Sequence, residues 1–206
     1  MQKIAIIIAI FVSGLLNAQG NYENGMMKAF ELWQANNMSE AGHLFERIAE
    51  AEEGNWLPKY YAAHVSILSS FGETDESKLS ARLEKAQNLL NDAMTYSPEN
   101  PEIMVLQALL YTAWISYDGA KYGMTLSGKV YATYAKAQTM APTNPRVVLA
   151  KAEWEMGSAS YFGQDTKPFC KDVERSLDLF ANFKPESEFH PKWGKERAEQ
   201  ILSNCN

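Results

Sequence analysis

The sequence is poor in the residues that carry out catalysis or bind metals. Only three histidines occur in 206 residues, His43, His64 and His190, and they fall in different segments without the spacing of a zinc site. The chain contains no H-E-x-x-H, C-x-x-C, glycine-rich phosphate loop or G-x-S-x-G motif. We therefore predict no catalytic, cofactor-binding or metal-binding residues, and we expect that the protein is not an enzyme.

Positive charge is also scarce. The chain has 19 lysines and arginines against 25 aspartates and glutamates, a net charge of −6 at pH 7, and no basic run. Nucleic acids attract clustered lysine and arginine through their phosphates, so this balance argues against a nucleic-acid partner.

Long hydrophobic runs are absent except at the start of the chain. A basic start at residues 1–3 precedes the apolar run 4–16, and small and polar residues follow at 17–19. This order is typical of a secretory signal peptide, and the run is shorter than the roughly 20 residues that span a bilayer. We predict a signal peptide over 1–18, cleaved after Ala18 or else Gly20, with a retained anchor as the alternative. The mature chain, 19–206, would be periplasmic or extracellular and without a transmembrane span.

Cysteine is limited to two residues, Cys170 and Cys205, both beyond the predicted signal peptide. An even number in an exported chain favours one disulfide, because that compartment is oxidising. Two unpaired, partly buried thiols are the alternative. In a helical array the bond would join antiparallel helices over 167–182 and 191–204 and would fasten the terminal helix.

An internal repeat organises the rest of the chain. Residues 93–103 read AMTYSPENPEI, and residues 137–147, 44 positions later, read AQTMAPTNPRV. In both, the last proline opens an apolar segment. Prolines that begin similar segments recur at steps of 43, 44 and 46 residues: Pro58, Pro101, Pro145 and Pro191.

The chemistry of the junctions predicts helix starts at these prolines. The first position of a helix needs no backbone N–H, which suits proline. Asn100 and Asn144 precede two of the prolines and offer side-chain oxygens to the free N–H groups of the first turn. Leu57 and His190 supply no comparable cap before Pro58 and Pro191.

The spacing of apolar and breaking residues predicts an all-α fold of four helical hairpins and a C-terminal capping helix. No stretch alternates like a strand. Alanine recurs seven positions after Pro101, Pro145 and Pro191, and five positions before Pro98 and Pro142. Such small residues are expected where two helices pack closely. The hairpins are expected at about 22–52, 58–96, 101–140 and 145–182, and the capping helix at 191–204.

The repeated A-x-T-x-x-P-x-N-P pattern, followed by alanine, resembles tetratricopeptide (TPR) repeats, and the resemblance implies a TPR-like α-solenoid over the mature chain. The period of about 44 residues exceeds the family's 34, and we assign the excess to longer second helices and to breaks at 118–123 and 159–167. Those breaks and the tail 183–196 are also similar to a group of uncharacterised exported bacterial TPR proteins.

TPR arrays bind partners in the concave groove lined by the first helix of each pair. The resemblance therefore implies partner-binding candidates on these helices, although packing under the next hairpin is the favoured interpretation for Phe30 and Trp33. The candidates are Met26, Phe30, Trp33, Arg146 and Glu153.

Two hypotheses for function follow. The first is a non-catalytic scaffold of the bacterial cell envelope that binds an unknown protein or peptide in the groove. The alternative is a small-ligand receptor or enzyme with a pocket at the breaks 118–123 and 159–167, where Asp118 and Asp165 would converge with a histidine. Homo-oligomerisation through the groove is a further possibility.

Overall fold

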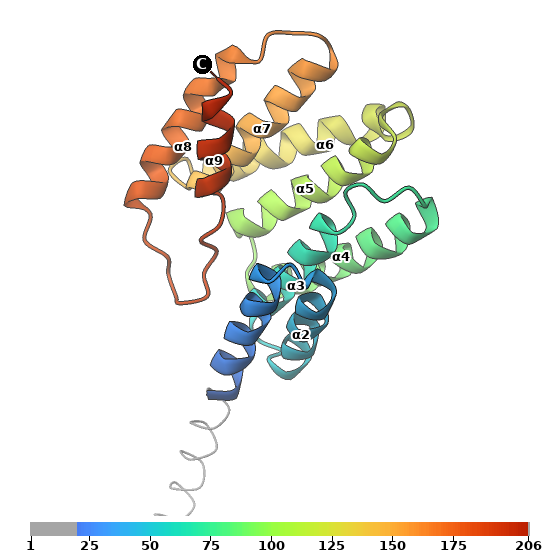
Figure 1. The fold of residues 1–206 in the computed structure, drawn as a ribbon, viewed down its shortest axis with the longest axis vertical. Helices are drawn as coiled ribbons and strands as arrows, with labels where there is room; N and C mark the ends of the chain where they lie inside the picture. Colours follow the sequence, from blue (N-terminus) through green and yellow to red (C-terminus); the bar gives the residue numbers. More distant parts are fainter. Residues whose placement is uncertain (1–19, 206) are drawn as a thin grey trace, which may run out of the picture.

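The computed structural model describes residues 20–205, and these residues form an all-α fold with no strand among them (Figure 1). The predicted signal peptide lies outside the described part. Within 20–205, no helix is long and apolar enough to cross a membrane. Residues 20–34 are helical, and the helices that follow are α2 (Met38–Ala51), α3 (Trp56–Leu68), α4 (Glu76–Tyr96), α5 (Pro101–Tyr117), α6 (Gly119–Met140), α7 (Pro145–Tyr161), α8 (Cys170–Asn182) and α9 (Lys195–Ser203), with a 3₁₀ turn, η1 (Lys167–Phe169), before α8.

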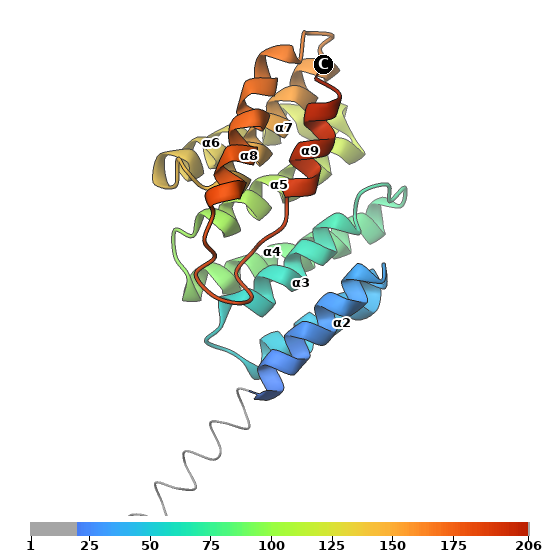
Figure 2. The same ribbon diagram turned by 60° about the vertical axis from the view of Figure 1, so that its left-hand side comes forward.

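The helices form successive pairs that lie one beyond another along the molecule (Figures 1 and 2). The first helix of each pair packs on the first helix of the next, so that α3 contacts α5 and α5 contacts α7. We call the helix over 20–34 together with α3, α5 and α7 the first-helix layer. The predicted all-α fold is thus confirmed, and the pairs fall near the predicted hairpins.

Two of the four predicted helix starts are confirmed in detail. Pro101 and Pro145 are the first residues of α5 and α7. The side chain of Asn100 accepts a hydrogen bond from the backbone N–H of Glu102 at 2.8 Å, and Asn144 accepts one from Arg146 at 2.9 Å. Proline and asparagine therefore have the roles that the repeat predicts.

The other two predicted helix starts are wrong. Helix α3 begins at Trp56, two residues before Pro58, because Asn55 caps it by accepting from the N–H of Leu57 at 3.0 Å. Pro191 starts no helix, since α9 begins at Lys195. Gly194 has a left-handed φ of 113°, and a Cβ there would lie 2.8 Å from Phe180 Cζ, so the backbone turns before the helix begins.

The small residues at repeated positions are buried, as their spacing predicts. They lie where neighbouring helices pack, and a larger side chain there would have to displace a helix, at a cost of about 1–3 kcal/mol. The exposed fractions are 3% for Val65, 1% for Ala152 and 0% for Ala93, Ala108, Ala137 and Ala198.

The predicted break at 118–123 is also wrong, because only Asp118 separates α5 from α6. Its carboxylate caps α6 by accepting a hydrogen bond from the N–H of Lys121 at 2.9 Å. The break between α7 and α8 is real, but it begins after Tyr161, three residues later than expected.

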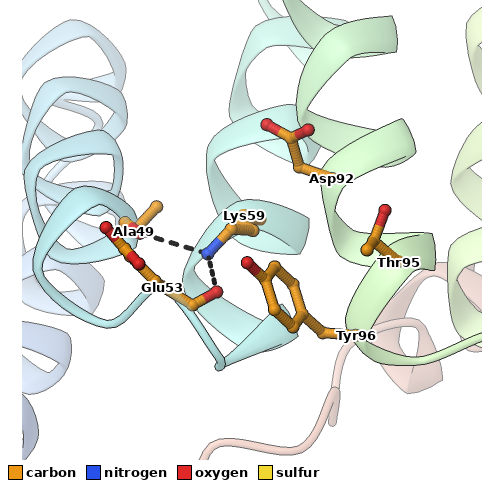
Figure 3. A pocket seen from close by; sticks show the side chains of 6 residues that line it. All are labelled: Ala49, Glu53, Lys59, Asp92, Thr95 and Tyr96. Atoms are coloured by element: carbon orange, nitrogen blue, oxygen red, sulfur yellow. Dashed lines mark hydrogen bonds between the residues drawn. The ribbon is translucent and has the colours of Figure 1, made fainter.

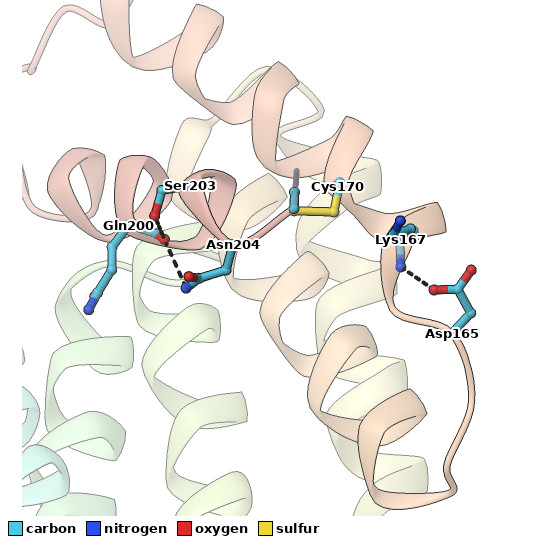
Figure 4. Close-up of a disulfide and its surroundings, with 7 residues drawn as sticks. Asp165, Lys167, Cys170, Gln200, Ser203 and Asn204 are labelled. Carbon is cyan, nitrogen blue, oxygen red and sulfur yellow. Dashed lines mark hydrogen bonds between the residues drawn. A yellow bond between two sulfur atoms is a disulfide. The ribbon is translucent and has the colours of Figure 1, made fainter.

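The predicted disulfide joins Cys170, the first residue of α8, to Cys205, just beyond α9 (Figure 4). Closing a loop with a sequence separation of 35 residues removes conformational freedom from the unfolded chain. The bond fastens the last helix to α8, which is its main packing neighbour.

Between α8 and α9 the chain makes a long excursion without a helix. These twelve residues, 183–194, are called the cover segment below. In Figure 2 the segment descends from the end of α8 to the level of α3 and then returns to α9. Its side chains contact residues of all four helices of the first-helix layer.

Candidate functional site

The predicted partner-binding residues of the first helix are occupied by packing. Met26 is fully buried. The ring of Phe30 lies edge-on to that of Tyr61, with centroids 4.7 Å apart, and Trp33 lies edge-on to His64 at 5.1 Å. These rings pack the helix over 20–34 against α3 and contribute to an aromatic surface on the first-helix layer.

The cover segment lies on this aromatic surface. Tyr61 Oη donates a hydrogen bond to the carbonyl oxygen of Phe189 at 2.9 Å, and Trp193 Nε1 donates one to Tyr60 Oη at 2.8 Å. The Phe189 ring packs edge-on against Tyr22, with centroids 5.5 Å apart. We call the rings that meet here the inner aromatic cluster: Tyr22, Phe30, Trp33, Trp56, Tyr60, Tyr61, His64, Phe189 and Trp193.

His64 lies inside this cluster. Its imidazole is 4% exposed, and its ring centroid is 4.8 Å from that of Trp193 and 6.0 Å from that of Tyr60. Nδ1 is buried and has no hydrogen-bond partner, a state that costs about 1–3 kcal/mol. Burial lowers the pKa of His64 to about 3, against a weak opposing effect of the Glu102 carboxylate. The imidazole is therefore neutral at physiological pH, which is the form that binds metal ions.

Arg146 and Glu102 form a buried ion pair beside the cluster. Arg146 Nε donates to Glu102 Oε2 and Nη2 donates to Oε1, both at 2.6 Å, and Asn144 Nδ2 donates to the same Oε1 at 2.6 Å. Arg146 is therefore buried beneath the surface on which partner binding was predicted. Its guanidinium lies 4.4 Å from the ring centroid of Phe183 in the cover segment, and Nη1 is buried without a partner.

The Glu102 carboxylate remains ionised in spite of its burial. Burial opposes the charge on Glu102, but His190, Arg146 and Asn144 outweigh this effect, and the pKa of the carboxyl lies below its usual value. His190 Nε2 lies 3.8 Å from Glu102 Oε1, beyond hydrogen-bond distance, and is a neighbouring polar group of the carboxylate. The cover segment therefore supplies part of the surroundings of this carboxylate.

Glu153, the remaining predicted partner-binding residue, lies on the surface. It accepts a hydrogen bond from Arg197 Nε at 2.7 Å and so connects α7 to α9. The side chains are 30% and 56% exposed, and ion pairs this open contribute roughly 1 kcal/mol or less. The structure therefore separates Glu153 from the inner aromatic cluster.

The acidic residues of the predicted alternative pocket each take part in a local hydrogen bond. Asp118 and Asp165 each accept a hydrogen bond from a nearby backbone N–H, that of Lys121 and that of Lys167 respectively. Among residues 20–205, no three His, Cys, Asp or Glu side chains form a group that fits a metal ion. Tyr161 and Phe162, at the end of α7, are 74% and 69% exposed and offer an open aromatic pair.

A groove between α2 and α4 has a different character. One part of it encloses about 260 Å³ beside Lys59 and Tyr96 (Figure 3). Lys59 Nζ donates hydrogen bonds to the carbonyl oxygens of Ala49 and Glu53, at 3.1 and 2.8 Å. These bonds provide partners for carbonyl groups at the C-terminal end of α2, which lack partners within the helix. The ammonium group is therefore engaged by backbone carbonyls, and the remaining polar side chains of this part of the groove are Glu53, Asp92, Thr95 and Tyr96.

Comparisons with known proteins add one similar structure. No family model matches the chain, and no curated protein matches it. The HusA haemophore from Porphyromonas gingivalis has a similar structure, with a TM-score of 0.78 and 24% sequence identity over 89% of this chain and 91% of the haemophore. This likeness shows a shared helical fold, and the resemblance to TPR repeats remains a prediction.

The inner aromatic cluster could hardly be predicted from the sequence. His64 was noted only as a histidine without the spacing of a zinc site, and no role was predicted for Phe189 or Trp193. The hydrogen bonds that bring the cover segment to α3 join residues 128 and 133 positions apart. No local pattern indicates such a contact. The concentration of aromatic residues at 56–61 and 183–193 was the only available signal.

Proposed function

We propose that this chain is an exported, non-catalytic binding protein for a flat and largely apolar small molecule of the porphyrin class. Export rests on the predicted signal peptide and on the Cys170–Cys205 disulfide, which fits an oxidising compartment. The ligand would bind on the first-helix layer, at the inner aromatic cluster.

One observation supports this proposal most strongly: an aromatic surface shared by the helix over 20–34 and α3 is covered by an irregular segment. Small-molecule sites are typically lined by apolar and aromatic side chains with a few polar groups. Irregular segments of this length in compact domains are often binding loops or lids. Trp33, Tyr60 and Tyr61 give the surface its rings, and His64 and Arg146 give it its few polar atoms.

The chemistry of a porphyrin suits this surface. Its conjugated plane stacks on indole and phenol rings in the way that aromatic side chains stack on one another. Its carboxylates need cationic partners, and Arg146 Nη1 is without a hydrogen-bond partner beneath the cover segment. The HusA haemophore has a similar fold, and its name denotes haem carriage. This likeness favours haem within the porphyrin class.

The test is a titration of the chain lacking residues 1–18 with iron(III) protoporphyrin IX and, separately, with metal-free protoporphyrin IX. Three of the five tryptophans, Trp33, Trp56 and Trp193, belong to the inner aromatic cluster, so binding should quench tryptophan fluorescence. We expect saturation at one ligand per chain with a Kd of roughly 1 µM or tighter, which is about −8 kcal/mol.

A matched pair of variants locates the site. Trp33→Phe should lower the quenched amplitude, whereas Trp154→Phe, on α7 beside Tyr131, should leave the quenched amplitude unchanged. Absence of saturable binding by either porphyrin would refute the proposal. Equal loss of quenching in both variants would place the ligand elsewhere.

A TPR-like peptide-binding scaffold is the second candidate, and one observation favours it. The first-helix layer already holds an extended stretch of polypeptide, the chain's own cover segment, through a backbone carbonyl and buried rings. A partner peptide with aromatic residues at the same spacing would replace it. Crosslinking in the native cell envelope that captures one protein at Phe30 or Trp33, together with no porphyrin binding, would favour this candidate.

A further inference from the structure

We propose that residues 184–188, the tip of the cover segment, are a site of limited proteolysis that opens the inner aromatic cluster. The Cys170–Cys205 disulfide keeps the cleaved chain in one piece. An endopeptidase would hydrolyse one peptide bond of the tip, which consumes one water and forms a new carboxylate and a new amino group. The effect of cleavage on ligand binding rests on the proposed porphyrin function, whereas the cleavage itself does not.

The tip is open to solvent, whereas the residues that follow it are buried. All residues of 184–188 are exposed and lie outside any helix, and the side chain of Glu186 is 85% exposed. Phe189 and His190, directly after the tip, are 8% and 7% exposed. Exposed loop tips with polar residues are preferred sites of proteolytic nicking. A protease can therefore reach the tip while the cover segment still lies on the inner aromatic cluster.

The disulfide encloses the tip in a covalent ring. Cys170 is the first residue of α8 and Cys205 follows α9, so the bond flanks α8, the cover segment and α9. A cut within 184–188 therefore leaves the two pieces covalently joined. The exposed loop 162–165 differs, because it precedes Cys170 and lies outside the ring. A cut there would leave the two pieces joined by packing alone.

The piece beyond the cut depends on this bond. Its helix, α9, has nine residues, and isolated helices of this length are marginal in water. Ala198 packs in a small apolar cluster with Leu149 and Ala152, and the ion pair of Arg197 with Glu153 is largely exposed. In the intact chain the cover segment already tethers α9 to α8. A second, covalent tether becomes essential when the first one is cut.

Cleavage should favour displacement of the cover segment. In the intact chain a displaced segment must still join the end of α8 to the start of α9, which restricts its freedom. A cut removes this restriction and leaves Phe189 and Trp193 attached to the fold through α9 only. Closing a flexible loop of about twelve residues costs roughly ten- to fortyfold in an equilibrium constant. The affinity for a ligand that competes with the segment should therefore rise about tenfold.

The experiment uses a glutamyl endopeptidase, because the tip contains Glu186 and Glu188 whereas the exposed loop 162–165 contains no glutamate. The chain lacking residues 1–18 is compared with its Glu186→Gln, Glu188→Gln double variant. Mass spectrometry of the parent should first show the addition of one water, and reduction should then release two fragments that part within the tip. The double variant should stay intact for the same time. First cleavage elsewhere, or fragments that separate without reduction, would overturn the proposal.

Opening is measured first without a ligand. Hydrogen–deuterium exchange within residues 189–193 should be faster in the cleaved parent than in the intact parent, with exchange in α8 unchanged. Titration with metal-free protoporphyrin IX should then show binding about tenfold tighter after cleavage. The protease-treated double variant should bind like the intact parent. Unchanged exchange within 189–193, or unchanged affinity in a parent that binds, would overturn the role of cleavage.

The outcomes separate this inference from the proposed function. Faster exchange after cleavage, with no porphyrin binding by either form, would refute the proposed function and leave the cleavage site standing. The protein purified from its own cells should contain the cleaved, disulfide-linked form. Material that is entirely uncut would overturn a biological role of the site.

Discussion

His64 is an ionisable side chain in surroundings that favour only its neutral form. Its closest neighbours are the rings of Trp33, Tyr60 and Trp193, and the nearest charge that acts on it is the Glu102 carboxylate. Protonation of His64 in the folded state would therefore place a charge in an apolar site. The imidazole and the Glu102–Arg146 pair are buried polar groups of the layer beneath the cover segment, and each leads to a measurable consequence.

His64 should make stability depend on pH. In the unfolded chain a histidine takes up a proton near pH 6.5, whereas burial lowers the pKa of His64 in the folded protein to about 3. Between these values the unfolded state binds more protons, so stability is lost as the pH falls. From pH 6.5 to pH 5 this residue should reduce the free energy of unfolding by about 2 kcal/mol. Urea unfolding of parent, His64→Phe and His43→Phe checks this, and an equal slope with pH in parent and His64→Phe would contradict it.

The ion pair should be sensitive to the loss of one partner. Arg146→Met leaves the Glu102 carboxylate buried without its main counter-charge and should lower the free energy of unfolding by roughly 3–5 kcal/mol. The double variant Glu102→Met with Arg146→Met removes both charges and should lose less than Arg146→Met alone. Urea unfolding measures both losses. Equal losses would show that the carboxylate does not depend on Arg146.

At the scale of elements, the cover segment and α9 are held in different ways. The cover segment is attached by two tyrosine hydrogen bonds and by buried rings, whereas α9 is fastened covalently to α8. The segment can therefore exchange with a ligand while α9 stays in place. Separate substitutions test the two attachments.

Loosening the cover segment should strengthen ligand binding. Tyr60→Phe keeps the ring but removes the acceptor of the 2.8 Å hydrogen bond from Trp193 Nε1, and a hydrogen bond contributes about 1 kcal/mol to the closed form. Because a ligand competes with the segment, the affinity for metal-free protoporphyrin IX should rise about fivefold. Tyr134→Phe, at a buried tyrosine of α6, serves as the control. Weaker binding by Tyr60→Phe would show that the segment helps to hold the ligand.

Loss of the disulfide should affect stability globally. Replacing Cys170 and Cys205 together by alanine frees a loop with a separation of 35 residues, which corresponds to about 4 kcal/mol in the chain-entropy model. We expect a loss of about 2–4 kcal/mol in urea unfolding, and a similar loss for the parent after reduction. An unchanged unfolding midpoint with and without reductant would contradict this expectation.

At the scale of the whole molecule, the sequence predicts features that arise from neighbouring residues and misses those that arise from distant ones. The all-α class, the helix starts at Pro101 and Pro145 and the buried alanines follow from local spacing and capping. The start of α3 was missed because Asn55, three residues before Pro58, provides the cap. Asp118 caps α6 directly and removes the expected break.

The candidate site could not be predicted from the sequence, for a physical reason. The groove predicted to be open is covered by a segment that starts at the end of α8 and reaches the first helix, where Phe189 meets Tyr22. Arg146 is buried because its partner, Glu102, lies one helical pair away. Neither contact leaves a periodic pattern in the sequence, whereas the disulfide was predicted because only two cysteines were available to form it.

The most direct test of the account is hydrogen–deuterium exchange, measured by mass spectrometry, with and without saturating metal-free protoporphyrin IX. The account predicts faster exchange within residues 184–193 when the ligand is bound, together with slower exchange within residues 56–68 of α3. Faster exchange would show that the ligand displaces the cover segment from the inner aromatic cluster. Binding that leaves 184–193 unchanged, or that protects residues 157–166 at the end of α7 instead, would contradict the account.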